Sequence, residues 1–225
     1  MTVRPLRICI PAAAVLGAAA LAQPALAVPV LASGPKACYV YVNPAARESI
    51  RLRATGFTPL TAVDYIVDGT RITSFDSNAQ GVVKVLEPAP VQEHGERALT
   101  ITLAEHGNPA NTLTMTTRVT ALAVTLNPKR AATSSRIRFR GRGFTQAKPI
   151  WAHYVFRDRV RKTVRFADGP ASACGTFSVR RPQIPILRPR AGTWKLQVDQ
   201  QKRWAPTPKS VFVPVPITVR RIIGG

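Results

Sequence analysis

The fold follows from a stretch that occurs twice: residues 50–58 read IRLRATGFT, and residues 137–145 read IRFRGRGFT. Six of the nine positions are identical, at an offset of 87 residues. In both copies apolar and polar residues alternate until a Gly-Phe pair ends the pattern. Because side chains two apart lie on the same face of a strand, the pattern predicts a β-strand with one buried face and one outward face.

Three further pairs of stretches extend the repeat in both directions. The offset between the copies grows from 84 to 95 residues along the chain, which indicates insertions in the second copy. A period of this length is too long for a solenoid unit and fits two tandem β-sandwiches of about 100 residues each. We therefore predict sandwich domains at residues 28–122 and 123–225. The matching pairs are 40–44 with 124–128, 81–85 with 175–179, and 99–103 with 194–198.

Turn signals between the apolar stretches predict β-hairpins. The predicted strand at 63–67, VDYIV, runs into Asp68-Gly69, a dipeptide that favours a two-residue hairpin turn. In the second copy, Arg157-Asp158-Arg159 is the expected equivalent turn, between predicted strands at 150–156 and 160–166.

The predicted strands continue to the end of each copy. Closing strands are expected at 113–119 and 211–219, and Pro214 and Pro216 would place the second of them at a sheet edge. No stretch of helical length shows a 3.6-residue periodicity with caps. The predicted fold class is all-β, with two tandem immunoglobulin-like β-sandwiches after a signal peptide.

These features resemble the bacterial immunoglobulin-like modules of secreted and cell-surface proteins, including the IPT/TIG type. The resemblance lies in Gly56-Phe57 and Gly143-Phe144 after an alternating strand, in DSNAQG at 76–81 before a strand, and in GTWKL at 192–196. Together these motifs cover most of residues 38–220. The resemblance implies a non-catalytic module for adhesion, spacing or ligand display, on fold analogy alone.

Residues 1–27 are expected to form a cleaved secretory signal peptide. Arg4 and Arg7 give a basic start, residues 8–22 are largely apolar, and Ala25-Leu26-Ala27 is a small-x-small cleavage site. The alternative is a membrane anchor, but the apolar run is shorter than the roughly 20 residues that a spanning helix needs. We expect the mature chain to be secreted or associated with the cell envelope, without a membrane span.

The charge is distributed unequally between the two copies. The chain has a formal net charge of +21. Residues 28–122 carry eight basic and eight acidic residues, whereas residues 123–225 carry 22 basic and three acidic residues, a net charge of +19. A bias of the whole gene does not explain this contrast, and for solubility alone added acids serve better than added bases. We expect an anionic partner, because a cationic field of this size attracts polyanions.

The basic residues expected to contact this partner form three groups. The first occupies alternate positions of 136–142 and would form one outward row on a strand. The second lies on the predicted hairpin, and the third lies in a loop between two predicted strands. The sequence leaves open whether the first two groups share a face or lie on opposite sheets. The candidate anion-binding residues are Arg136, Arg138, Arg140, Arg142, Arg157, Arg159, Arg161, Arg165, Lys202, Arg203 and Trp204.

The three tryptophans have different expected places. Trp204 lies beside Lys202 and Arg203, where its ring either stacks on a base or sugar or folds back onto the domain. Trp151 and Trp194 lie on predicted strands with apolar neighbours, and we expect both in the core.

Two cysteines, Cys38 and Cys174, remain after cleavage of the signal peptide. Export permits a disulfide between them, which would join the start of the first domain to a loop of the second; two unpaired thiols are the alternative. The DSNAQG stretch at 76–81 shares features with half a calcium loop but lacks the closing Glu, so we expect a turn. We expect no metal site and no cofactor.

Catalytic motifs are missing from the sequence. His94, His106 and His153 do not have metal-ligand spacing, and no GxSxG, P-loop or GxGxxG motif is present. A hydrolase with a dispersed Ser-His-Asp site is the catalytic alternative. We expect no enzyme but a protein whose second domain binds an acidic polymer or anionic surface: a cell-envelope polymer, an acidic polysaccharide, lipid head groups or nucleic acid. The rival is a structural or adhesive envelope module with a protein partner.

Overall fold

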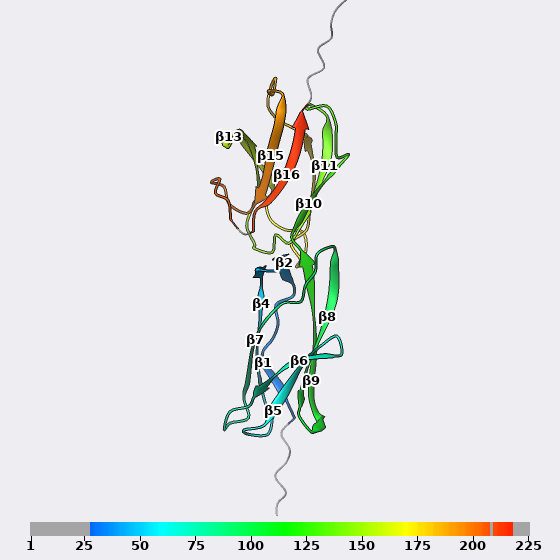
Figure 1. Cartoon of the computed structure of the whole chain (residues 1–225), viewed down its shortest axis with the longest axis vertical. Helices are drawn as coiled ribbons and strands as arrows, with labels where there is room; N and C mark the ends of the chain where they lie inside the picture. The colour runs from blue at the N-terminus through cyan, green and yellow to red at the C-terminus, as the bar shows by residue number, and fades with distance from the viewer. Residues whose placement is uncertain (1–27, 208, 218–225) are drawn as a thin grey trace, which may run out of the picture.

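Two β-sandwiches stand end to end in the computed structural model, which describes residues 28–207 and 209–217 (Figure 1). The expected signal peptide, residues 1–27, lies outside the described residues. No helix long and apolar enough to cross a membrane occurs in the described part of the chain. The strands of the first sandwich are β1 (Val30–Ser33), β2 (Tyr39–Asn43), β3 (Ala46–Arg47), β4 (Ser49–Thr55), β5 (Ala62–Val67), β6 (Thr70–Asp76), β7 (Val83–Pro88), β8 (Glu96–Glu105) and β9 (Asn108–Ala121).

The second sandwich repeats this strand order with fewer elements. Its sheets are β10-β11-β14 and β13-β12-β15-β16, and the corresponding sheets of the first sandwich are β1-β4-β7 and β3-β2-β9-β8-β5-β6. The first sandwich adds β2 and β3, and β2 pairs in parallel with β9. The match of residues 40–44 with 124–128 is therefore not a structural equivalence, because β1 and not β2 takes the place of β10. The strands of the second sandwich are β10 (Ala123–Asn127), β11 (Arg136–Arg142), β12 (Ile150–Phe156), β13 (Arg159–Ala167), β14 (Phe177–Pro182), β15 (Gly192–Asp199) and β16 (Val211–Ile217).

The repeated stretch forms the central strand of the three-stranded sheet in each copy. Ile50 and Leu52 of β4 are buried in the first core, and Ile137 and Phe139 of β11 are buried in the second. The residues between them face outward. The alternation predicted from the sequence is therefore confirmed, and each copy has its own hydrophobic core.

The Gly-Phe pair anchors each central strand to the next strand of the same sheet. Phe57 and Phe144 are buried, and their backbone N–H groups donate to the carbonyl oxygens of Gly81 (3.3 Å) and Gly175 (3.1 Å). A Cβ atom on Gly81 would lie 2.1 Å from the Phe57 carbonyl oxygen, and one on Gly175 would lie 2.3 Å from the Phe144 nitrogen. Both glycines have a positive φ. The Gly-Phe pair therefore makes the same close contact with a later glycine in both sandwiches.

The DSNAQG stretch is a turn, as expected. The side-chain oxygen of Asn78 accepts hydrogen bonds from the N–H groups of Gln80 (3.0 Å) and Val82 (2.9 Å). Such local side-chain bonds replace the backbone partners that a tight turn cannot supply.

Both predicted hairpins are present. Asp68 and Gly69 have φ values of 48° and 82° and join Val67 to Thr70 across a two-residue turn. The second hairpin differs from the prediction by one residue, because Arg159 pairs with Phe156 as the first residue of β13. Only Arg157 and Asp158 form the turn, with φ values of 50° and 54°. A two-residue turn with two positive φ values matches the natural twist of paired strands.

The closing strands also follow the prediction, and residues 218–219 of the second one lie outside the described residues. β9 extends well beyond residues 113–119 on both sides, because it pairs along its whole length with β8. β16 contains Pro214 and Pro216 and pairs only with β15, at the edge of its sheet. Proline has no backbone N–H to donate, so it would leave a gap in the hydrogen-bond ladder of a central strand but is tolerated at an edge.

Candidate anion-binding surface

The outer face of the sheet β10-β11-β14 carries the first group of predicted residues. We call this surface the basic face. In β11 the inward positions are buried, whereas Arg136, Arg138, Arg140 and Arg142 alternate with them on the outward side. Successive members of this row are about 6.8 Å apart along the strand. The expected outward row is therefore present as one column of guanidinium groups.

Neighbouring strands extend this column into a grid. Arg138 pairs with Asn127 of β10 on one side and with Arg180 of β14 on the other. Directly opposed side chains have Cβ atoms about 4.5–5.5 Å apart, so the like charges of Arg138 and Arg180 repel each other. The three strands of this sheet contain no Asp or Glu. The basic face thus has a cationic centre without an acidic neighbour in its own sheet.

The acidic residues of the second sandwich are engaged elsewhere. Asp158 lies 3.2 Å from the Lys195 Nζ, and Asp168 lies 2.7 Å from an Arg165 Nη. Asp199 is buried. Within residues 28–207 and 209–217, the four arginines of β11 have no carboxylate ion pair. Their charge is therefore available to an external anion.

The second predicted group lies on the opposite sheet. Arg159, Arg161 and Arg165 belong to β13, the outermost strand of β13-β12-β15-β16, and Arg157 lies in the adjacent turn. The structure thus decides the question that the sequence leaves open: the two rows occupy opposite sheets of one sandwich. Arg165 is engaged with Asp168. The guanidinium carbon of Arg157 lies 5.4 Å from the ring centre of Phe156.

The third predicted group lies in the loop between β15 and β16. This loop folds over the outer face of the larger sheet, because the indole N–H of Trp204 donates to the Gln197 side chain at 2.7 Å. Trp204 is half-buried there, while Lys202 and Arg203 are exposed. Of the two alternatives for Trp204, the structure thus has the ring folded back.

The other two tryptophans differ from each other. Trp194 is buried in the second core, as expected. Trp151 was expected in the core as well, but it lies half-exposed on the outer face of β12, with the Lys202 Nζ 6.0 Å from its ring centre. The expectation for Trp151 is wrong because β12 is covered on both faces, so its apolar neighbours do not indicate which face points inward.

A buried polar network fixes the same loop. Burial raises the pKa of Asp199, but hydrogen bonds from His153, from the Gln197 amide and from the Gln201 N–H outweigh it and hold that pKa below its usual value. His153 is fully buried; its Nδ1 lies 2.9 Å from the Thr163 hydroxyl and its Nε2 lies 3.0 Å from the Gln201 carbonyl.

In a nucleophilic triad, the imidazole lies between the serine hydroxyl and the carboxylate, and this network is arranged differently. The Ser210 hydroxyl donates to the Asp199 carboxylate (3.2 Å) rather than facing the imidazole of His153. In the described part of the chain, no group of three or more His, Cys, Asp or Glu side chains is placed to hold a metal ion. The network holds the loop against the sheet, because Gln197 of β15 donates to the Ala205 carbonyl (3.1 Å) and accepts from Trp204.

A cavity of about 460 Å³ lies at the end of the basic face, where the two sandwiches meet. Arg140 and Arg142 line it from β11, and Glu96 of β8 lines it from the first sandwich. Glu96 forms an ion pair of 2.6 Å with Arg118 of β9. Sequence reasoning missed Glu96, because only the tertiary fold brings β8 to the basic face. The remaining polar residues of the cavity are Thr125, Thr176 and Ser178.

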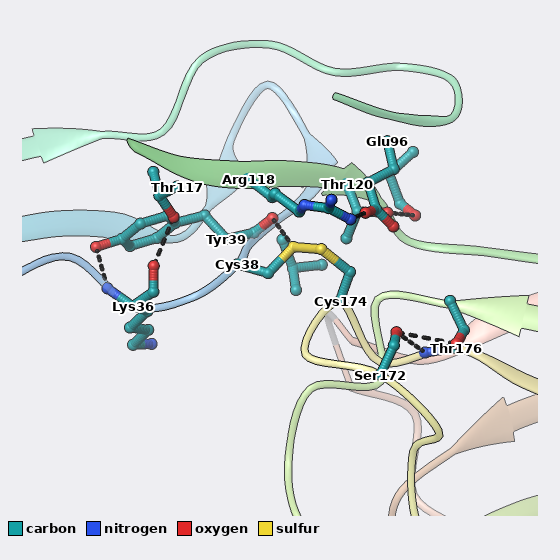
Figure 2. The surroundings of a disulfide bond; sticks show 12 residues. Lys36, Cys38, Tyr39, Glu96, Thr117, Arg118, Thr120, Ser172, Cys174 and Thr176 are labelled. Atoms are coloured by element: carbon teal, nitrogen blue, oxygen red, sulfur yellow. Dashed lines mark hydrogen bonds and ion pairs between the residues drawn. A yellow bond between two sulfur atoms is a disulfide. The ribbon is translucent and has the colours of Figure 1, made fainter. Parts of the chain in front are cut away.

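A disulfide joins the two sandwiches next to this cavity. Cys38 and Cys174 are bonded, with Cα atoms 5.1 Å apart. Figure 2 shows the bridge between the Arg118–Glu96 ion pair of the first sandwich and the loop of the second sandwich that carries Thr176. The junction has two further links: the Leu122 N–H donates to the Tyr41 carbonyl (2.8 Å), and the Lys209 ammonium pairs with Glu48 (2.6 Å).

Comparison with known proteins does not identify a family for this chain. No protein-family model matches the chain, and no curated protein does. Among solved structures, the BSP domain of a biofilm-associated protein covers 85% of this chain at 14% identity, with a TM-score of 0.27. A tetra-tandem repeat from the extending region of a large adhesion protein covers 84% at 12% identity, with a TM-score of 0.29.

The first eight immunoglobulin domains of the Down syndrome cell adhesion molecule cover 85% of the chain at 11% identity, with a TM-score of 0.31. This chain spans only 29%, 47% and 28% of the three structures, respectively. The assignment of the fold therefore rests on the strand order of this chain and not on these likenesses. In each copy, a three-stranded sheet faces a second sheet that holds the hairpin and the last two strands. The chain consists of two tandem immunoglobulin-like β-sandwiches.

Proposed function

We propose that the protein is a secreted or envelope-associated, non-catalytic module that binds an anionic polymer through the basic face of its second sandwich. One observation carries the proposal: the column of arginines on β11, extended by Arg180, has no acidic residue in its own sheet. The expected signal peptide supports export. The three acids of the second sandwich pair with other groups or are buried, and Glu96 of the first sandwich reaches only the end of the column, where it pairs with Arg118. An external anion is therefore expected as the counter-charge for the rest of the column.

Arginine suits this role better than lysine does. The planar guanidinium forms two parallel hydrogen bonds to a carboxylate, sulfate or phosphate group. A polymer with repeated charges can engage several members of the column at once. Such an anion would also relieve the repulsion between Arg138 and Arg180, so binding is expected to stabilise the second sandwich.

The repeat supplies a matched pair of variants for the test. Arg138→Glu with Arg140→Glu reverses two charges on the basic face, and Arg51→Glu with Arg53→Glu makes the same change at the equivalent exposed positions of β4. The measurement is the salt concentration that elutes each protein from immobilised polyanions. We expect the β11 variant to elute at clearly lower salt than the wild type, and the β4 variant to elute at nearly the same salt as the wild type. Wild-type retention of the first variant would refute the proposal.

The salt dependence gives a second readout of the same contact. With about five phosphate contacts to duplex DNA, log affinity should fall with log salt at a slope of about −4.5. Reversing two of the contacting charges should reduce this slope in magnitude, whereas the matched change on β4 should leave it unaltered. Equal slopes in all three proteins would place the contact elsewhere.

The first sandwich offers a second candidate function, as the contact site for a protein partner. A cavity of about 520 Å³ lies on it, lined by Tyr65, Val67 and Pro88. The Ile72 side chain at its rim is 54% exposed. Binding by this surface would survive high salt and would be lost in Ile72→Asp, while the charge reversals on β11 would leave it intact.

A further inference from the structure

We propose that the cavity at the junction of the two sandwiches binds one anionic sugar unit, and that the polymer is therefore an acidic polysaccharide rather than a nucleic acid. This inference rests on the proposed function, because the same arginines supply the charge. It adds a defined site, a ligand class and a contribution from the first sandwich.

The cavity has the size and the donor groups for a charged sugar. Its volume of about 460 Å³ is large for a bare anion and falls within the usual range of small-molecule sites. Arg140 and Arg142 supply cationic donors, and Arg140 lies between Thr125 and Ser178 in the register of the sheet. A hydroxyl can donate or accept. The lining thus offers charge for a carboxylate or ester anion and neutral partners for sugar hydroxyls.

Glu96 makes this site different from a simple anion site. Its carboxylate lies in the same cavity as the two arginines, and its pair with Arg118 leaves lone pairs free, since a carboxylate has about four acceptor positions. A ligand must therefore bring hydrogen-bond donors as well as negative charge. Glu96 repels the anionic group of any of these ligands, but sugar hydroxyls can donate to it and offset this cost, whereas polyphosphate and the backbone of DNA have no such donors.

The junction holds the two walls of the cavity together. The loop that carries Cys174 also supplies Thr176, and the Ser172 hydroxyl accepts hydrogen bonds from the N–H (3.3 Å) and hydroxyl (2.9 Å) of Thr176 (Figure 2). The bridge to Cys38 ties this loop to the sandwich that carries Glu96. Both sandwiches are thus needed for the complete site.

The test uses the full mature chain on four polymers, each immobilised at the same amount of charge per volume of resin: polygalacturonate, a sulfated galactan, inorganic polyphosphate and duplex DNA. We expect the wild type to elute from both sugar polymers at higher salt than from polyphosphate or DNA. Glu96→Gln should lower the ratio of the affinity for the sugar polymers to the affinity for polyphosphate about tenfold. The substitution removes a charged acceptor for sugar hydroxyls and also removes the repulsion between Glu96 and phosphate. Asp76→Asn changes the net charge equally at the far end of the first sandwich and should leave the preference unaltered.

A second variant removes only neutral groups. Thr125→Val with Ser178→Ala deletes two hydroxyls of the cavity without changing any charge. The loss of two hydrogen bonds should weaken binding to the sugar polymers about tenfold and leave polyphosphate binding unchanged.

The outcomes separate this inference from the proposed function. A wild type without preference for the sugar polymers, or equal shifts in Glu96→Gln and Asp76→Asn, would overturn the sugar site while the charge reversals on β11 still report on the basic face. A wild type that none of the four polymers retains would overturn both. Preference for only one of the two sugar polymers would support the site and identify its anion as a carboxylate or a sulfate ester.

Discussion

Gly175 shows how closely two loops approach each other inside one sandwich. It combines a φ of 71° with a backbone neighbour that leaves no room for a side chain, since a Cβ atom would lie 2.3 Å from the Phe144 nitrogen. The backbone of Gly175 cannot move away from Phe144 without breaking a hydrogen bond, because the Phe144 N–H donates to the Gly175 carbonyl. The second sandwich therefore depends on a residue without a side chain at this point.

Gly175→Ala should lower the free energy of unfolding by roughly 2–4 kcal/mol, because it adds both a strained φ and a steric conflict with backbone. Gly169→Ala is the matched control, since nothing lies within 4 Å of its Cβ position and its φ is not positive. The control should change stability by less than about 0.5 kcal/mol. Urea denaturation of the two variants measures the difference, and equal stabilities would contradict the close approach.

At the scale of the element, the loop between β15 and β16 depends on a buried carboxylate. The pKa of Asp199 is lowered in the folded protein: burial opposes ionisation, but the hydrogen bonds from His153, Gln197 and Gln201 favour it more strongly. A lowered folded pKa stabilises the folded state above the unfolded pKa of about 3.9, and this contribution disappears as the pH falls through the folded pKa. The loop should therefore loosen in acid.

Asp199→Asn should remove this part of the acid dependence. We expect the wild type to lose stability as the pH falls below about 4, and the variant to be less stable at pH 7 with a flatter acid profile. Trp204 donates to Gln197, so its fluorescence reports on the loop directly. An identical pH profile in both proteins would show that Asp199 does not control the loop.

Strand faces were predictable in this chain, but sheets and contacts between sandwiches were not. Alternation in residues 50–55 and 136–142 assigns an inward and an outward side, because one face of each strand is buried. It cannot say in which sheet β11 or β13 lies, so the placement of the two arginine rows on opposite sheets emerges only from the fold. Trp151 was misplaced for a related reason, since a strand covered on both faces has no readable alternation.

The candidate site was predictable only in part for the same physical reason. The arginines of β11 were visible as a period of two within one strand. Glu96 was not, because its contact with the basic face depends on how the two sandwiches meet. Thr125 and Ser178 become neighbours of Arg140 through strand register, which needs the pairing of β11 with both β10 and the more distant β14.

At the scale of the whole molecule, the disulfide sets the relation between two separately packed cores. Each sandwich has its own hydrophobic cluster, so neither needs the bridge to form its core. The bridge joins residues 136 positions apart and restricts the unfolded chain, an effect of roughly 2–5 kcal/mol for long loops. Its second effect is to limit movement at the junction beside Leu122.

Cys38→Ser with Cys174→Ser should leave both sandwiches folded and loosen the junction. We expect the unfolding transition to move to lower urea and the two sandwiches to unfold less cooperatively. Small-angle scattering should show a wider distribution of overall dimensions than in the oxidised wild type. Unchanged dimensions would mean that the Lys209–Glu48 pair and the Leu122–Tyr41 bond suffice to hold the junction.

The place of the bridge has a mechanical consequence. When the two ends of the chain are pulled apart, the covalent path runs from the N-terminal side into Cys38, across the sulfur atoms and out through Cys174. The strands from β2 to β13 lie between these two residues and are excluded from that path. Tension can peel away β1 and the strands from β14 onward, but it cannot extend the greater part of the first sandwich. Under the same force, the bridged chain therefore lengthens less than an unbridged chain would.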